Sequence, residues 1–303
     1  MATFDLIIIG TGITGLAAAR QAAKDGLVAA MLEERFFGGL VVNINELEGE
    51  VEGSGSDVAA VMMREAAKLG VKNLTARASA IARKGEVLVV STDTGELQAR
   101  SVVIATGARL KTLGVPGEAE FEENGVSHCA DCDGPFYKGQ DVVVVGGGDS
   151  AVQEALVLAE FAKQVHLVHL GAALTARPAL TDRLASHANI SVHANTQVEA
   201  ITGEGTLTGV LLRTGADTRE LACTGVFPYI GLEPAGECAP PEVARDASSA
   251  LVTDAALQTA VPGVFAAGAV RAGYGGFLAD AIAEGTAAAQ AAAAYCRRSG
   301  TSG

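Results

Sequence analysis

Short runs of apolar residues alternate along the chain with longer segments of helical length. The apolar runs cover residues 6–9, 28–32, 102–105, 142–145, 165–168 and 264–266, and the helical segments cover residues 13–24, 58–69, 151–161 and 278–295. Unbroken apolar runs of this length are typical of parallel strands that are covered on both faces. The alternation therefore predicts an α/β fold with right-handed crossovers between parallel strands.

A strand, a glycine-rich turn and a helix follow one another twice, at residues 6–24 and again at residues 142–161. This repetition predicts two Rossmann-like nucleotide-binding domains in one chain. Turn-rich stretches at residues 113–118 and 231–241 are the expected connections between the domains. We expect a smaller domain of residues 114–239 to be inserted into a discontinuous domain made of residues 1–113 and 240–303.

Composition and charge exclude several classes of function. The chain of 303 residues carries a net charge of −13, which opposes binding to the phosphate backbone of a nucleic acid. No apolar run approaches the roughly 20 residues of a membrane span, and the first residues lack the basic segment of an export signal. We expect a cytoplasmic protein with no membrane or nucleic-acid partner, whose five cysteines do not form a structural disulfide framework.

The first glycine-rich turn contains Gly10, Gly12 and Gly15. In a dinucleotide-binding fold the first glycine permits a tight turn, the second lets the backbone approach a pyrophosphate, and the third lets the helix pack on the strand. The N-terminus of the following helix supplies amide donors for the pyrophosphate. Glu33 ends the next predicted strand, about 20 residues further on, where an acid binds a ribose hydroxyl. This turn therefore predicts a dinucleotide site.

The second glycine-rich turn, at residues 146–148, lacks the residues that would complete such a site. The strand after it ends in the sequence His-Leu-Gly at residues 169–171, which offers neither an acid for a ribose hydroxyl nor a pair of arginines for a 2′-phosphate. The nearest cation, Arg177, lies several residues further on. We interpret this turn as part of a nucleotide-binding fold that does not hold a nucleotide tightly.

Cys129 and Cys132 form a Cys-x-x-Cys motif, and Asp133 follows it directly. Thiols at this spacing can close a small disulfide that exchanges with a dithiol or disulfide of a substrate. Asp133 is placed to carry the proton that this exchange moves. Half of a zinc site is the main alternative, but it needs two further ligands, and the sequence has no second motif of this kind. A pair of inert buried thiols is the other alternative. We expect redox chemistry at this motif and no metal.

These three motifs, in this order, resemble the low-molecular-weight thioredoxin reductase family of flavoproteins. The resemblance covers nearly the whole chain, and its most specific part is the run Cys-Ala-Asp-Cys-Asp-Gly directly before the second glycine-rich turn. It implies a homodimer whose discontinuous domain binds FAD and whose inserted domain is similar to NAD(P)-binding domains. It also implies that Cys132 faces the flavin, that Cys129 exchanges with the substrate and that Asp133 is the acid/base. The cofactor-binding residues that the resemblance implies are Gly10, Gly12, Ile13, Thr14, Gly15, Glu33, Gly38, Gly39, Leu40, Asn45, Ala105, Thr106, Gly107, Gly268 and Ala269.

The sequence departs from this family at three places. Residues 169–171 stand where reductases that use NADPH have a His-Arg-Arg run. Ala269 replaces an aspartate that holds the ribityl chain of FAD in the family, and Leu40 replaces a glutamine. The first departure indicates an electron donor other than NADPH, whereas the other two indicate an FAD site with altered contacts.

The missing NADPH anchor leaves the direction of electron flow open. A related group, the dithiol oxidases of gliotoxin, holomycin and romidepsin biosynthesis, takes electrons from a small-molecule dithiol and passes them to oxygen without a nicotinamide. Our first expectation is therefore an FAD-dependent dithiol oxidase that acts on a small-molecule dithiol. The alternative is a thioredoxin reductase that receives electrons from NAD(P)H or ferredoxin and acts on a thioredoxin-like protein. A flavin-containing redox sensor without catalysis is the second alternative.

Overall fold

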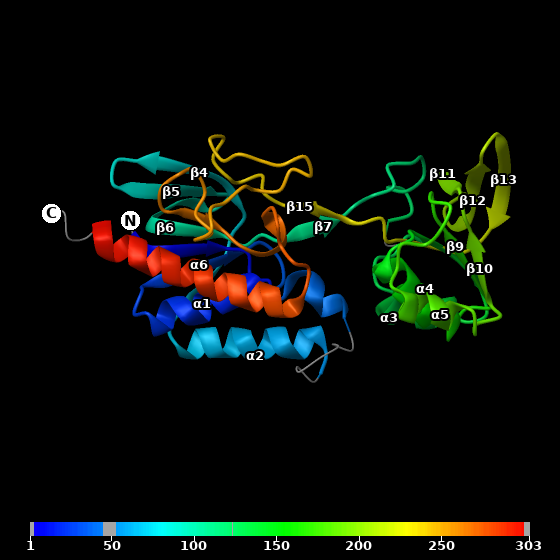
Figure 1. The fold of residues 1–303 in the computed structure, drawn as a ribbon, viewed down its shortest axis with the longest axis horizontal. Coiled ribbons are helices and arrows are strands. Elements are labelled where there is room, and N and C mark those ends of the chain that lie inside the picture. The colour runs from blue at the N-terminus through cyan, green and yellow to red at the C-terminus, as the bar shows by residue number, and fades with distance from the viewer. Residues whose placement is uncertain (1–2, 45–52, 123, 300–303) are drawn as a thin grey trace. The chain divides into compact units, whose positions relative to one another are not determined.

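The computed structural model describes residues 3–44, 53–122 and 124–299. The chain divides into two compact units, of which unit 1 is Met1–Arg109 with Glu233–Gly303 and unit 2 is Leu110–Leu232 (Figure 1). These limits lie a few residues before the domain boundaries predicted at 113/114 and 239/240. The turn-rich stretch at 113–118 belongs to unit 2, because the amide of Ile201 donates to the carbonyl oxygen of Pro116 at 2.9 Å and Leu113 and Val115 pack against the core of that unit. The chain crosses from one unit to the other at β7 (Ala108–Leu110) and returns at β15 (Leu232–Pro234), and these two strands pair with each other.

Unit 1 is built on a mixed sheet with the strand order β3-β2-β1-β6-β5-β4, in which β16 also pairs with β6. Its strands are β1 (Thr3–Ile9), β2 (Ala29–Glu33), β3 (Lys72–Thr75), β4 (Ala78–Lys84), β5 (Val87–Thr92), β6 (Gly95–Ile104) and β16 (Val264–Ala266). The pairs β1–β2, β1–β6, β2–β3 and β6–β16 are parallel, whereas β4, β5 and β6 form an antiparallel meander. Except for the mostly exposed β3, the parallel strands contain the buried apolar runs of the sequence. Because they are parallel, the carboxyl ends of β1, β2, β6 and β16 meet at one edge.

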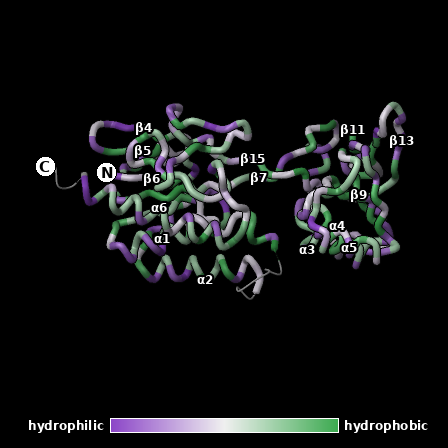
Figure 2. Tube along the Cα trace, viewed as in Figure 1, coloured by the Kyte–Doolittle hydropathy of each residue, from purple (hydrophilic) through white to green (hydrophobic). Residues whose placement is uncertain are grey.

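Three long helices cover this sheet: α1 (Ile13–Lys24), α2 (Gly55–Lys68) and α6 (Leu278–Ser299). α1 contacts both α2 and α6, and the alanine-rich α6 runs alongside it (Figure 1). Hydrophobic and hydrophilic residues alternate along α2, as expected for a helix with one face on the core (Figure 2). α2 begins three residues before the predicted start at 58, because Ser54 and Asp57 form a capping box at its N-terminus. None of the helices in the described part of the chain is long and apolar enough to cross a membrane.

Unit 2 contains a parallel sheet with the strand order β10-β9-β8-β14 and a separate antiparallel sheet, β11-β12-β13. The parallel strands are β8 (Asp141–Val145), β9 (Gln164–Val168), β10 (Ile190–His193) and β14 (Gly225–Pro228). The antiparallel strands are β11 (Thr196–Gly203), β12 (Leu207–Thr214) and β13 (Asp217–Ala222), and the helices are α3 (Ala130–Asp133), α4 (Asp149–Ala159) and α5 (Pro178–Leu184). α4 packs against β8 and β9 and also against α3, which places the cysteine motif beside the second strand–turn–helix.

Candidate functional site

The first glycine-rich turn joins β1 to α1 at the carboxyl edge of the unit 1 sheet. Gly10 has a φ of 97°, and a Cβ at this position would lie 2.4 Å from the carbonyl oxygen of Ala105. A Cβ at Gly15 would lie 2.0 Å from the carbonyl oxygen of Gly10. A Cβ at Gly12, in contrast, would come no closer than 3.7 Å to its nearest neighbour, the carbonyl oxygen of Gly38. Packing therefore requires glycine at the first and third positions, whereas a Cβ at Gly12 would make only an ordinary van der Waals contact in front of the N-terminus of α1.

Residues from distant parts of unit 1 converge on this turn. The amide of Gly38 donates to the carbonyl oxygen of Thr11 at 2.8 Å, and a Cβ at Gly39 would lie 3.4 Å from the Cα of Gly12. A Cβ at Gly268 would lie 2.3 Å from Oγ1 of Thr14, so this contact also requires glycine. The predicted residues that lie at or near this edge are Gly10, Gly12, Ile13, Thr14, Gly15, Glu33, Gly38, Gly39, Ala105, Thr106, Gly107 and Gly268. Asn45 lies outside the described residues.

Glu33 ends β2 beside the turn. One of its carboxylate oxygens, Oε2, accepts hydrogen bonds from the amide and the hydroxyl of Thr11, both at 3.0 Å. The other oxygen accepts from the amides of Glu34 and Arg35 at 3.0 and 3.3 Å. These bonds fix a carboxylate at the edge where parallel strands end, which is the position of a ribose-binding acid.

This part of unit 1 fits the pyrophosphate and a ribose of a dinucleotide such as FAD. Glycine at position 12 has no side chain to block the approach of a pyrophosphate, and no side chain caps the N-terminus of α1, so its amides would be available to that pyrophosphate. Glu33 would accept a ribose hydroxyl. Two of the predicted cofactor-binding residues offer no polar side chain to FAD. The Ala269 methyl group cannot accept a hydrogen bond. Leu40, on η1 (Gly39–Asn43), has an apolar side chain that is 38% exposed.

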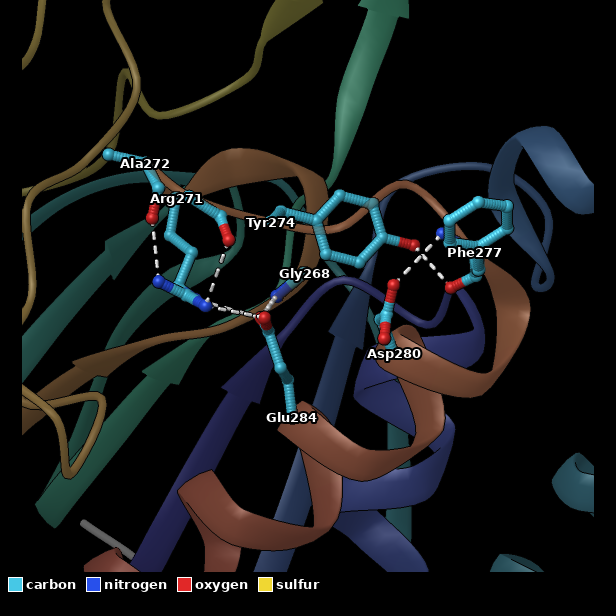
Figure 3. Close-up of polar contacts among 8 residues, drawn as sticks. Gly268, Arg271, Ala272, Tyr274, Phe277, Asp280 and Glu284 are labelled. Atoms are coloured by element: carbon cyan, nitrogen blue, oxygen red, sulfur yellow. Dashed lines mark hydrogen bonds and ion pairs between the residues drawn. The ribbon is translucent and has the colours of Figure 1, made fainter.

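An ion pair that was not predicted from the sequence supports the segment around Ala269. Glu284 on α6 accepts from the amide of Gly268 at 2.8 Å and from Nε of Arg271 at 2.9 Å (Figure 3). The two charged side chains are only 18% and 14% exposed, and Arg271 also donates to the carbonyl oxygen of Ala272 at 2.6 Å. The pair therefore fixes the backbone at η3 (Gly268–Val270), opposite the glycine-rich turn. An isolated glutamate within an alanine-rich helix was the signal available in the sequence.

The cysteine motif lies in unit 2 and forms a disulfide. Cys129 and Cys132 are bonded, with their Cα atoms 5.3 Å apart, and Cys129 is the N-terminal cap of α3. Cys132 is exposed and Cys129 is partly exposed, so a reaction partner can reach the bond. Asp133 accepts from the hydroxyl of Ser127 at 2.5 Å, and the same hydroxyl accepts from the amide of Cys129 at 3.2 Å. This network holds the predicted acid/base beside the cysteine turn.

The second glycine-rich turn joins β8 to α4 and borders a cavity of about 730 Å³. Gly146 has a φ of 143°, and a Cβ there would lie 2.2 Å from the carbonyl oxygen of Tyr229. A Cβ at Gly148 would meet nothing closer than Oγ1 of Thr175, at 3.9 Å. The backbone thus resembles that of the first turn, because packing requires one glycine, Gly146, and would tolerate a Cβ at another, Gly148.

The charges around this cavity differ from those of a phosphate site. Among the described residues that line it, none is a lysine or an arginine, and Leu170 is 72% exposed. The predicted nearest cation, Arg177, instead pairs with Asp149 in the first turn of α4, with 2.6 Å between Nε and Oδ2. Hydrogen bonds from the backbone amide and the side chain of Arg177 lower the pKa of Asp149. Arg177 is therefore already engaged by a carboxylate of the chain itself. Elsewhere in the described residues, no group of three or more His, Cys, Asp or Glu side chains is placed to hold a metal ion.

Comparisons with known proteins agree on the family. Residues 4–294 match the family model described as pyridine nucleotide-disulphide oxidoreductase. The thioredoxin reductase of Treponema pallidum is 39% identical over 299 residues, covering 96% of this chain and 97% of that protein, and the thioredoxin reductase of Bacillus subtilis is 35% identical, covering 96% and 94%. The crystal structure of thioredoxin reductase from Lactococcus lactis is similar with a TM-score of 0.92 and 32% identity, covering 97% of this chain and 99% of that one.

These similarities confirm the predicted α/β fold with two Rossmann-like domains and the resemblance to thioredoxin reductases. They give no support to the dithiol oxidase branch, which was our first expectation, and they fit the reductase alternative better. The chain belongs to the pyridine nucleotide-disulphide oxidoreductase family, and it is a flavin-dependent thiol–disulfide oxidoreductase of the thioredoxin reductase kind.

Proposed function

We propose that this chain binds FAD in unit 1 and reduces the disulfide of a thioredoxin-like protein through Cys129 and Cys132. The observation that carries the proposal is the exposed Cys129–Cys132 disulfide in a chain whose relatives are thioredoxin reductases. The glycine-rich turn in unit 1, with Glu33 beside it, supports FAD as the bound flavin.

When bound, FAD would supply a carrier for the two electrons that reduce the Cys129–Cys132 disulfide. The amides at the N-terminus of α1 would hold its pyrophosphate and Glu33 a ribose hydroxyl. In the exchange with substrate, the Cys129 thiolate would attack the substrate disulfide, and Cys132 would then displace the substrate from the mixed disulfide. The protein dithiol becomes a disulfide and the substrate disulfide becomes a dithiol, so electrons balance. Asp133, fixed by Ser127, would give the proton to the leaving sulfur.

An exposed aromatic side chain beside the disulfide favours a protein substrate. Phe136 lies on η2 (Gly134–Tyr137), which follows α3 directly, and it is 76% exposed. Large exposed aromatic residues are enriched where proteins bind one another, because they bury much apolar area on association. This position beside the redox pair suits docking of a protein that presents its own disulfide.

We further propose that the electron donor is not NADPH. Without a lysine or arginine on the cavity of unit 2, a 2′-phosphate would lose charge-assisted hydrogen bonds worth roughly 1.5–3 kcal/mol each. The loss of two would weaken NADPH binding by about two to four powers of ten. The same observation keeps a second candidate function, the dithiol oxidase, because that direction of electron flow needs no nicotinamide.

Anaerobic stopped-flow mixing tests the donor and the direction together. The purified flavoprotein is mixed separately with NADPH, NADH, reduced ferredoxin and a dithiol, and bleaching of the flavin is recorded, followed by addition of oxidised thioredoxin. We expect slow bleaching by NADPH and fast re-oxidation of the reduced protein by thioredoxin. The Cys129→Ser variant is the control that must not reduce thioredoxin. Peroxide formation from a dithiol in air, with no transfer to thioredoxin under nitrogen, would assign the chain to the oxidases instead.

A further inference from the structure

A glutamate that none of the steps above uses lies directly beneath the cysteine turn. Glu154 is on α4, and its Oε2 accepts from the amide of Ala130, the residue after Cys129, at 3.3 Å. The hydroxyl of Tyr229, the residue after β14, donates to the same oxygen at 3.3 Å and accepts from the Ala130 amide at 3.2 Å. Ala130 itself is completely buried. The carboxyl group, the phenol and the amide thus form a closed triangle at the base of α3.

The surroundings of this carboxyl group disfavour its charged form. Burial, and secondly the carboxylate of Asp131 on α3, raise the pKa of Glu154 to about 7, while the hydrogen bonds from the Ala130 amide and Tyr229 oppose this rise. Burial, with Glu154 nearby, raises the pKa of Tyr229 as well, so the phenol stays a neutral donor. Asp133 hydrogen-bonds to Ser127 instead. Glu154 is therefore a group that changes charge near neutral pH beside a bond that gains electrons.

We propose that Glu154 is a positioning residue that holds the cysteine turn and takes up a proton when the Cys129–Cys132 disulfide is reduced. This inference rests on the proposed redox function of the pair.

A dithiol reductant delivers two electrons and becomes a disulfide. The Sγ–Sγ bond breaks, one sulfur keeps the bonding pair, and the other takes the pair that the reductant delivers. At equilibrium the reduced pair carries a growing share of thiolate as the pH rises towards the ordinary thiol pKa of about 8.5. A negative sulfur adjacent to Ala130 raises the pKa of the Glu154 carboxyl further, because like charges at short range disfavour ionisation. Glu154 therefore binds one proton from solvent in a pH range that starts near 7 and extends upward.

Linkage fixes the sign of the effect. In this range the reduced protein binds more protons than the oxidised protein, so rising pH opposes reduction more strongly than the thiols alone would. For one extra proton, the equilibrium constant for reduction falls by up to tenfold more per pH unit. A glutamate that served only as a hydrogen-bond acceptor for Ala130 would leave this slope unchanged.

The test is a redox titration of the disulfide against the dithiothreitol couple from pH 6 to pH 9. The state of the pair is read by alkylation and mass spectrometry of the peptide that contains Cys129 and Cys132, so the readout is independent of turnover. The Glu154→Gln variant keeps an acceptor for Ala130 but cannot bind a proton in this range. Glu160→Gln is the matched control, because Glu160 is an exposed glutamate at the C-terminal end of the same helix.

We expect wild type and Glu160→Gln to share a steeper pH profile above pH 7 than Glu154→Gln. The Tyr229→Phe variant removes a bond that favours the Glu154 carboxylate, so its steep region should begin at a higher pH. Parallel profiles for wild type, Glu154→Gln and Tyr229→Phe would overturn the inference, and Tyr229→Phe alone decides it if Glu154→Gln does not fold. If the wild-type Cys129–Cys132 pair is reduced and oxidised reversibly but never exchanges electrons with the flavin or thioredoxin, the proposed function is contradicted instead.

Discussion

The two glycine-rich turns differ less in their backbones than in the residues that end the next strand. In both, one glycine has a positive φ and a Cβ there would collide with a carbonyl oxygen, of Ala105 in unit 1 and of Tyr229 in unit 2. In both, no side chain caps the following helix. The first turn, however, has the Glu33 carboxylate beside it, whereas the second has an exposed Leu170 and an arginine already paired with Asp149.

The comparison separates what the fold requires from what a ligand requires. Glycines that avoid collisions within the chain would remain in a domain that had lost its nucleotide. A charged group at the end of the second strand avoids no such collision. Glu33 also accepts hydrogen bonds from Thr11, but its presence or absence reports more on the ligand than the glycines do. By this criterion unit 1 keeps the features of a dinucleotide site, and unit 2 keeps the framework without the anchor for a 2′-phosphate.

The largest expected effect comes from adding a side chain at the middle glycine of the first turn. Gly12 has ordinary backbone angles, φ −66° and ψ 178°, so Gly12→Val introduces no backbone strain and places its side chain where a pyrophosphate would lie. We expect a folded but colourless protein, measured as the ratio of flavin absorbance to protein absorbance together with circular dichroism. Gly148→Val makes the same change in the second turn and should stay fully yellow. A yellow Gly12→Val protein would refute the proposed flavin site.

The second effect concerns the cysteines, which give unit 2 its proposed role. Cys129→Ser and Cys132→Ser should each abolish turnover with thioredoxin, because exchange needs both sulfurs. If Cys132 faces the flavin, Cys129→Ser leaves a thiolate that forms a long-wavelength charge-transfer band with oxidised flavin, and Cys132→Ser does not. Absorbance spectra near pH 8 distinguish the two variants. The reverse pattern would exchange the roles of the two sulfurs.

The elements predicted correctly from the sequence are those whose pattern of apolar residues lies within one short segment. The buried parallel strands β1 and β8 contain unbroken apolar runs at residues 6–9 and 142–145, and α1 was predicted with its observed bounds. β4 and β13 were missed, because most of their residues are exposed and neither strand has an apolar run. α3 was also missed as a helix, since it has only four residues.

The candidate site shows the same limit. The glycines and cysteines have fixed spacings that can be read directly from the chain. The Arg271–Glu284 pair and the Glu154–Tyr229 contact join residues 13 and 75 positions apart on different elements, so only the folded chain brings them together. The environment of Glu154 also depends on burial, which the sequence around it does not reveal.

A third change would give the second turn the charge that it lacks. Leu170 is 72% exposed, so Leu170→Arg adds a cation at the end of β9 without disturbing the core. One charge-assisted hydrogen bond to a 2′-phosphate should raise the affinity for NADPH by about 10- to 100-fold. Fluorescence titration measures this affinity, with NADH as the ligand without a 2′-phosphate and Leu170→Gln as the uncharged control. Equal gains for NADH and NADPH would contradict the interpretation.

Gly171→Arg is a poorer place for the added charge. A Cβ at residue 171 would lie 3.1 Å from the carbonyl oxygen of Ala173, so the neighbouring loop must move slightly. In the double variant Leu170→Arg with Gly171→Arg, we therefore expect the logarithm of the NADPH affinity to rise by less than twice the rise that Leu170→Arg gives alone.

The smallest expected effect comes from releasing the cation that is already present. Asp149 and Arg177 form an exposed pair, with side chains 40% and 59% exposed, so Asp149→Asn should leave the melting temperature unchanged. The asparagine can still accept the amide hydrogen of Arg177, but it no longer holds the guanidinium by charge. The freed Arg177 should raise the affinity for NADPH by about two- to tenfold, because a single exposed cation contributes little.

Loss of the Asp149 carboxylate would also weaken the repulsion of any pyrophosphate, and that effect would raise the affinity for NADH equally. Titration with both nucleotides separates the two causes, and adding Arg177→Gln to Asp149→Asn should remove only the part specific to NADPH. If the gain survives that second substitution, repulsion by Asp149, and not the engagement of Arg177, is what distinguishes the second turn from a phosphate site.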